Sequence, residues 1–146
     1  MNEELAAALA VVLRDVRATC AVQPIVREEL DFDDAPLVML YEADGSGVGV
    51  SVPEGAAPAE QVADLAEQVK DWAVEALASQ LLPATWPECP GHPASHPLAA
   101  EVVGGTAVWS CPRTRRVVAP VGALAELGRA RGGGARGQFL RRTVSS

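Results

Sequence analysis

The sequence predicts an α+β fold, in which a helix, a three-stranded antiparallel sheet and a long helix precede a β-hairpin. Apolar residues recur at steps of three and four over residues 3–20 and 58–82, which is the spacing of one helix face. Between those segments, apolar and polar residues alternate in short runs separated by turn residues, as they do in strands. A third observation, a cluster of cysteines and histidines, brackets the predicted hairpin within residues 84–120.

Length and composition set the class of protein. The chain has 146 residues, 49% of them hydrophobic and 21% charged, which suits one globular domain and excludes wholesale disorder or a collagen-like fibre. The apolar stretch from Leu5 to Leu13 is too short to span a membrane and follows acidic Glu3 and Glu4 rather than a basic segment. We therefore expect a cytoplasmic protein. Three cysteines, an odd number, argue against a disulfide framework.

The first predicted helix, residues 3–20, carries an apolar stripe at steps of four, three and four, formed by Leu5, Leu9, Val12 and Val16. Cys20 continues this stripe, so we expect it to be buried rather than reactive. Strands are then predicted at about 24–32, 36–43 and 47–53. The second and third flank the turn sequence Asp44–Gly47 and should pair as a hairpin.

The second predicted helix, residues 58–82, begins with Pro58 in its first turn and has one apolar face that includes Trp72. We expect this face to pack on the preceding sheet, which completes an α+β layer over residues 1–83. Double-stranded-RNA-binding domains share this order of elements, but they place cations at the start of the second helix. Here Glu60 and Asp64 occupy that turn, so this function is rejected.

The chemistry of the chain is concentrated between residues 86 and 112. Both histidines and two of the three cysteines lie there, as Cys89, His92, His96 and Cys111. A thiolate and an imidazole separated by two residues can bind one ion when the backbone between them turns tightly, and Pro90-Gly91 favours such a turn. Short β patterns at 101–103 and 107–109 flank a Gly-Gly-Thr turn and would return Cys111 to the first pair. The four residues are therefore the candidate metal ligands.

This stretch resembles a zinc ribbon, in which two CPxCG-like knuckles hold one Zn²⁺. Cys89-Pro90-Gly91-His92 matches the first knuckle with histidine as its second ligand, and Trp109-Ser110-Cys111-Pro112 matches the start of the second. The sequence departs from the pattern at Thr114, where the last cysteine would stand, and His96 is the natural replacement. The resemblance covers about 30 residues and implies one structural zinc ion per chain. The CPxHxxxHPL…WxCP arrangement also looks like one in small uncharacterised actinobacterial proteins, which implies no activity.

The sequence offers weaker alternatives to this metal site. Without a metal, the cysteines and histidines would be chance residues of a Pro-rich loop. A catalytic zinc site of the deaminase type needs a glutamate where Gly91 stands, and a later CxxC pair that the chain lacks. Asp31, Asp33 and Asp34 could bind Ca²⁺ or Mg²⁺, although a solvated turn is the simpler interpretation. No catalytic residue is predicted, and we expect no enzyme.

The charge is divided unevenly along the chain. Residues 1–112 hold 4 Lys+Arg against 18 Asp+Glu, a balance of −14, whereas residues 113–146 hold 8 Arg against one Glu, a balance of +7. A short helix is predicted at 121–128, and the Gly/Arg-rich segment 129–146 is predicted to be disordered. That segment either solubilises the protein, folding back on its acidic body, or contacts nucleic acid or an acidic partner through its arginines, which are Arg129, Arg131, Arg136, Arg141 and Arg142.

Together these observations predict a non-enzymatic cytoplasmic protein with a structural zinc site, acting as a protein-binding or assembly module. A protein partner or self-association is expected, and a membrane is not. A nucleic-acid-associated protein that uses the arginine-rich segment and the zinc ribbon is the first alternative. A small enzyme whose site the sequence does not reveal is the second.

Overall fold

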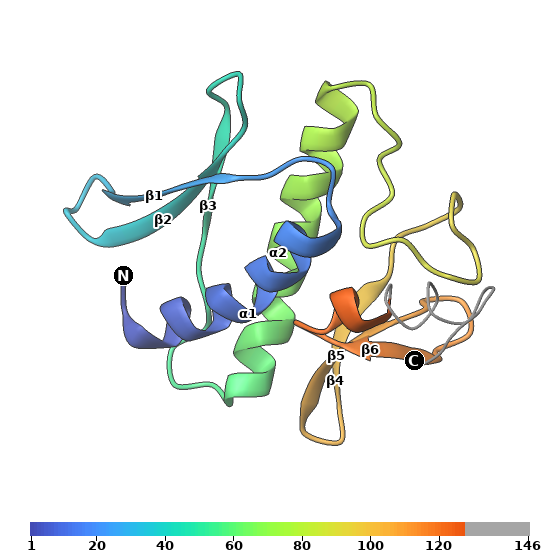
Figure 1. Ribbon diagram of the computed structural model, residues 1–146. Helices are drawn as coiled ribbons and strands as arrows, with labels where there is room; N and C mark the ends of the chain where they lie inside the picture. The colour runs from blue at the N-terminus through green and yellow to red at the C-terminus, as the bar shows by residue number, and fades with distance from the viewer. Residues whose placement is uncertain (128–146) are drawn as a thin grey trace.

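The described residues, 1–127, fold into two long helices, a short helical segment at 124–127 and two three-stranded antiparallel sheets, so the predicted α+β class is confirmed (Figure 1). The structure is a computed structural model that describes residues 1–127; the predictions made for residues 129–146 lie outside the described residues. No helix in this described part is both long and apolar enough to cross a membrane. The elements in chain order are α1 (Glu3–Thr19), β1 (Ile25–Leu30), β2 (Pro36–Tyr41), β3 (Gly47–Val50), α2 (Pro58–Ser79), β4 (Ala99–Val103), β5 (Thr106–Ser110) and β6 (Val117–Pro120).

Helix α1 begins and ends where its sequence favours. The side chain of Asn2 caps it by accepting a hydrogen bond from the backbone N–H of Leu5, and two glutamates in the first turn favour the helix dipole. The predicted apolar stripe is buried, and Val12 and Val16 are fully inaccessible. Cys20 follows the last turn and is buried, as expected from the continuation of the stripe.

The first sheet has the strand order β1-β2-β3, with Ile25 opposite Tyr41 and Val38 opposite Val50. Its first strand stops at Leu30, two residues before the predicted end, because the Asp31 carboxylate accepts hydrogen bonds from two backbone N–H groups of the following turn. Asp33 and Asp34, the other members of the acidic cluster, are exposed in that turn.

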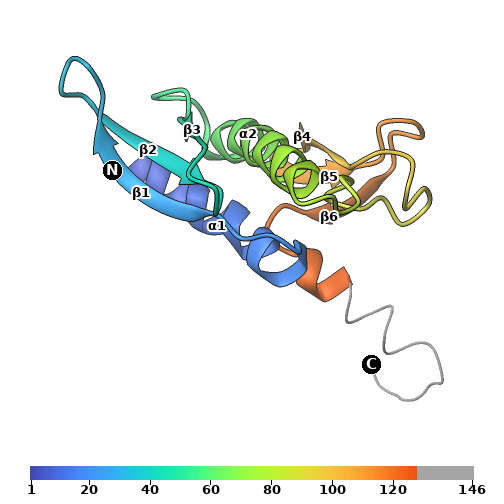
Figure 2. The same ribbon diagram turned by 90° about the horizontal axis from the view of Figure 1, so that it is seen from above.

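Helix α2 has more neighbours than the sequence suggested. It lies between the two sheets (Figure 2), packs against α1, β4 and β5, and meets the first sheet along β3. The preceding sheet is therefore only part of what its apolar face covers. Trp72 is buried, with 3% of its surface exposed, and lies on the side of α2 that faces β3.

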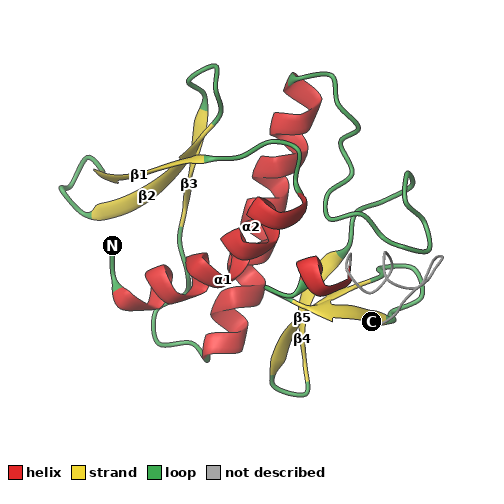
Figure 3. Ribbon diagram, viewed as in Figure 1, coloured by secondary structure: helices red, strands yellow, loops and turns green. Residues whose placement is uncertain are grey.

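The second sheet contains the predicted hairpin, β4 and β5, together with a third strand that the sequence analysis missed. Strand β6 pairs with β5, with a register irregularity between Trp109 and Ser110. It has only four residues, ends in Pro120 and shows no polar–apolar alternation, so its pattern was too weak to predict. Residues 124–127, within the predicted helix 121–128, are helical (Figure 3).

A buried carboxylate joins α1 to the second sheet. Asp15 is fully inaccessible and accepts three hydrogen bonds: from Trp109 Nε1 at 2.8 Å, from the backbone N–H of Gly122 at 2.6 Å and from that of Leu124 at 2.9 Å. Glycine suits position 122, because its φ is +98° and an added Cβ would lie only 2.9 Å from the side chain of Val11. Asp15 thus fixes α1 against β5 and against the turn that leads into the helical residues 124–127.

Candidate metal centre

Two short turns gather three of the four predicted ligands in the loop after α2. The backbone N–H of His92 donates to the carbonyl of Cys89 at 3.0 Å, and that of Ser95 donates to the carbonyl of His92 at 3.1 Å. The loop is closed by an isolated bridge between Glu88 and Pro97. This compact path places the three side chains on successive turns of one loop.

The fourth side chain comes from the end of the second sheet. Cys111 follows β5 directly, and pairing of β5 with β4 returns it to the loop, as the hairpin prediction required. The Cys111 backbone N–H donates to the carbonyl of Arg116, and the Arg115 N–H donates to the carbonyl of Cys111. Arg115 stands where a CPxCG knuckle has glycine, and it has the positive φ, +66°, that this position would take in a tight turn.

The four candidate ligands form a single cluster. Their ligand atoms all lie within 4.8 Å of one another, so they could hold one metal ion. His92 Nδ1 is 3.6 Å from the sulfur of Cys89 and 3.7 Å from that of Cys111, and His96 Nε2 is 4.0 Å from Cys111 Sγ. Both cysteines are buried and both histidines are half-buried, which shields the centre from water. It is the only such Cys/His/Asp/Glu group found among residues 1–127, and Asp31, Asp33 and Asp34 do not form one.

A backbone contact orients His96 as a ligand. Its Nδ1 lies 3.1 Å from the carbonyl oxygen of Pro97. Because a carbonyl only accepts, Nδ1 must donate, and the free lone pair is then on Nε2, the nitrogen that faces Cys111. Such an outer hydrogen bond fixes the tautomer and the ring orientation of metal-binding histidines.

Thr114 supports Cys111 instead of supplying a fourth ligand from the second knuckle. Hydrogen bonds from the Thr114 side chain and backbone lower the pKa of Cys111 to about 6. This pKa is below the ordinary value of a thiol. At neutral pH Cys111 is therefore mostly the thiolate, which is the form that binds metals. The sequence showed only that Thr114 replaces a cysteine; its contact with the sulfur required the structure.

We expect Thr114→Val to weaken metal affinity about tenfold at pH 7, because the valine keeps the side-chain volume but cannot donate to the sulfur. The loss should shrink at pH 9, where the thiolate forms without that help. Competition with a chelator at both pH values measures the effect. Thr106→Val, an exposed threonine at the start of β5, is the matched control and should leave affinity unchanged. Equal affinities for the two variants at pH 7 would contradict this role of Thr114.

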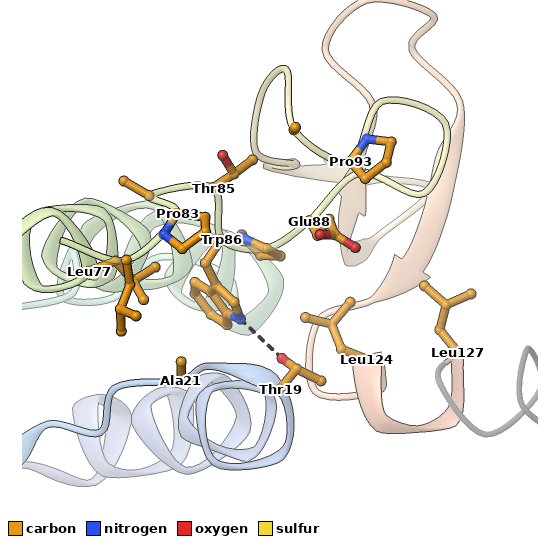
Figure 4. A pocket seen from close by; sticks show the side chains of 14 residues that line it. Thr19, Ala21, Leu77, Pro83, Thr85, Trp86, Glu88, Pro93, Leu124 and Leu127 are labelled. Atoms are coloured by element: carbon orange, nitrogen blue, oxygen red, sulfur yellow. Dashed lines mark hydrogen bonds between the residues drawn. The ribbon is translucent and has the colours of Figure 1, made fainter. Parts of the chain in front are cut away.

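The two tryptophans beside the ligands link the centre to α1. Trp86 and Trp109 pack edge to face, with ring centroids 5.7 Å apart, and both are buried. Trp109 donates to Asp15, and Trp86 donates to the hydroxyl of Thr19 at 3.0 Å (Figure 4). Their indole N–H groups thus anchor both ligand-bearing segments to one helix.

A cavity of about 800 Å³ lies next to Trp86, between the end of α1, the end of α2 and the helical residues 124–127 (Figure 4). Glu88 is the only charged residue among the described residues that line it, and the rest are mainly apolar. The hydroxyl groups of Thr19 and Thr85 are further polar groups in this lining.

Comparison of the chain with protein-family models, with curated proteins and with solved structures finds no match. The site therefore carries the functional argument. Two cysteines and two histidines could supply four ligand atoms to one metal ion, which is the number in a closed tetrahedral shell.

Proposed function

We propose that Cys89, His92, His96 and Cys111 bind one structural Zn²⁺ and that the protein is a non-enzymatic protein-binding or assembly module of the cytoplasm. The observation that carries the metal is the closed donor set of two sulfurs and two imidazole nitrogens. Tetrahedral sites of this composition are typical of zinc. A zinc ribbon, which the two knuckles resemble, uses its ion in the same structural way.

The distances support this choice of metal. Zinc–sulfur bonds of about 2.3 Å and zinc–nitrogen bonds of about 2.05 Å place neighbouring sulfur and nitrogen atoms of a tetrahedron about 3.6 Å apart. The sulfur–nitrogen distances of 3.6 and 3.7 Å to His92 agree with this, and the 4.0 Å distance to His96 is slightly longer. The ion would tie the loop that follows α2 to the end of β5.

Two features support binding over catalysis. The ligand shell has no open coordination position, which a catalytic zinc requires. The cavity beside the centre has a single charged residue, Glu88, among the described residues that line it. What remains for function is the protein surface and the uneven charge of the sequence, which is acidic over residues 1–112 and arginine-rich over residues 113–146.

Metal analysis and solution mass together test the proposal. Elemental analysis of the purified protein should find about one zinc per chain, and a His92→Ala, Cys111→Ser variant should lose it. If the protein self-associates, light scattering should show a mass that depends on its concentration. If it binds another protein, that partner should co-purify with it. Metal-free wild type would overturn the zinc site. Tight, sequence-selective binding to DNA or RNA that weakens steeply with salt would replace the assembly function by a nucleic-acid function.

A further inference from the structure

The edge strands of the two described sheets are β1, β3, β4 and β6, and features of three of them hinder the pairing of a further strand. The N–H and carbonyl of Ser51, directly after β3, both bond to the side-chain amide of Gln68 on α2, at 3.1 and 2.7 Å. The N–H of Ala100 in β4 donates to Glu67, also on α2, at 2.7 Å. Strand β6 has four residues and ends in Pro120. Helix α2 and a proline thus protect these three edges.

Strand β1 is the fourth edge, and its outer backbone groups are available for pairing. It has six residues without glycine or proline, and it lies on the side of its sheet away from α2 (Figure 2). The N–H of Asp31 donates to the carbonyl of Ala35 across the turn into β2, so the odd-numbered residues of β1 face β2. Val26, Glu28 and Leu30 therefore direct their N–H and carbonyl groups outward, where no hydrogen bond within residues 1–127 uses them.

The charged side chains of this edge are complementary to those of an identical strand. Arg27 and Glu29 are two residues apart, so both lie on one face of the sheet. The Glu29 carboxylate accepts a hydrogen bond from the hydroxyl of Tyr41 at 2.6 Å, which holds it on that face. Neither Arg27 nor Glu29 forms an ion pair with another of residues 1–127. An antiparallel strand of the same sequence can place the opposite charge in front of each of them.

We propose that β1 pairs with β1 of a second copy of this chain in antiparallel orientation, about a two-fold axis at Glu28. The axis places Arg27 opposite Glu29 of the second copy, and Glu29 opposite its Arg27. It also places Val26 opposite Leu30, and the two Glu28 residues opposite each other. The three residues with outward backbone groups thus face one another, so each of their N–H groups meets a carbonyl. Such an interface is self-complementary and closed, as in most homodimers.

The side chains on the other face of the strand pair are compatible with this alignment. Leu30 is 63% exposed, and Val26 of the second copy would cover part of its surface. The two Glu28 carboxylates lie opposite each other, which alone would destabilise the pair. In each copy, however, the N-terminal ammonium of Met1 lies 2.7 Å from the Glu28 carboxylate and offsets its charge.

Arg27 and Glu29 also disfavour the neighbouring registers. An axis at residue 27 would place Arg27 opposite Arg27, and an axis at residue 29 would place Glu29 opposite Glu29. Like charges directly opposite one another destabilise a strand pair. The charges of β1 therefore allow one alignment with a second copy and oppose the adjacent ones, as charged side chains do at protected sheet edges.

The inference rests on the proposed assembly function and deepens it, because it names the partner as a second copy. Sedimentation velocity of the full-length protein over about 1–500 μM should show a mass that rises from one chain towards two. Arg27→Glu creates opposed glutamates and Glu29→Arg creates opposed arginines, so each variant alone should raise the dimer dissociation constant at least about tenfold. Arg17→Glu makes the same charge change on the exposed side of α1 and should associate like wild type.

Mixing the two variants separates a lost interface from a damaged fold. In an equimolar mixture, a chain with Arg27→Glu meets one with Glu29→Arg, and both opposite-charge pairs are restored. The mixture should therefore dimerise as tightly as wild type, which two misfolded chains could not do. A mixture that associates no better than its separate components would overturn the proposal.

The backbone pairing is tested at the axis. Glu28→Pro and Glu28→Ala both lose the ion pair with Met1, but only the proline also removes the outward N–H. The alanine variant should dimerise at least as tightly as wild type, and the proline variant about tenfold more weakly. Equal association of wild type and the Glu28→Pro variant, or a wild type that stays monomeric, would overturn the proposal. Zinc analysis of the same samples keeps the results distinct, because a zinc-bound monomer contradicts this inference alone and a metal-free dimer contradicts the zinc site alone.

Discussion

Removal of the bound metal is expected to lower the melting temperature by about 10–20 °C, because binding of a structural zinc is coupled to folding. The proposed ion would join the loop after α2 to the end of β5. Without it, two cysteine sulfurs and two imidazoles would lie within 4.8 Å of one another with no cation to stabilise them. Cys89→Ser should give a comparable loss, because a hydroxyl is a poor zinc ligand.

Circular dichroism melts with and without EDTA measure this effect. Cys20→Ser provides a matched control, because Cys20 is also a buried free cysteine but does not belong to the cluster. Its own melting temperature can change, but the shift that EDTA causes should equal that of wild type, whereas Cys89→Ser should show almost none. A wild-type protein whose melting temperature EDTA leaves unaltered, after loss of metal is verified, would contradict a structural role.

Replacement of Asp15 by alanine is expected to cost about 3–9 kcal/mol of unfolding free energy. The estimate follows from three buried N–H donors that lose their acceptor, each at about 1–3 kcal/mol. The donors are Trp109 Nε1 and the backbone N–H groups of Gly122 and Leu124. Because small domains have only about 5–15 kcal/mol of stability, the variant should be close to unfolding at room temperature.

Urea unfolding followed by tryptophan fluorescence measures the difference. Asp15→Asn keeps the shape and one acceptor oxygen, so its loss should be smaller than that of the alanine variant. Arg17→Ala removes an exposed charge from the same helix and should change stability by less than about 1 kcal/mol. If Asp15→Ala behaved like Arg17→Ala, the carboxylate would not be the joint between α1 and the second sheet.

The parts of the fold that the sequence predicted are those governed by local periodicity. The stripe of Leu5, Leu9 and Val12 defined α1, and the turn glycines between β2 and β3 placed their hairpin. The ends of strands were less predictable, because side-chain contacts such as the turn around Asp31 decide where pairing stops. Strand β6 depended on pairing with β5, a non-local interaction that four residues ending in proline do not signal.

The candidate site divides in the same way. Cys89, His92 and His96 were predictable because three ligands within eight residues need only a tight loop, and Cys111 because a hairpin returned it to that loop. The hydrogen bonds around these ligands could not be predicted, because such bonds depend on three-dimensional placement. Asp15 could have been suspected as a lone acidic residue seven positions after Ala8 and three after Val12, on the buried side of α1. Its partners, 94 to 109 residues away, left no trace in the local pattern.

Those long separations have a consequence for folding on the ribosome. The carboxylate of Asp15 cannot be buried with its hydrogen bonds until Trp109, Gly122 and Leu124 have been synthesised. In the same way, Thr19 cannot accept its hydrogen bond until Trp86 has been synthesised. At synthesis rates of about 5–20 residues per second, the delay for Asp15 is about 5–20 s. During that time the apolar stripe of α1 can pack only on the first sheet and on α2. Helix α1 is therefore made before the other described elements and is among the last of them to reach its final contacts.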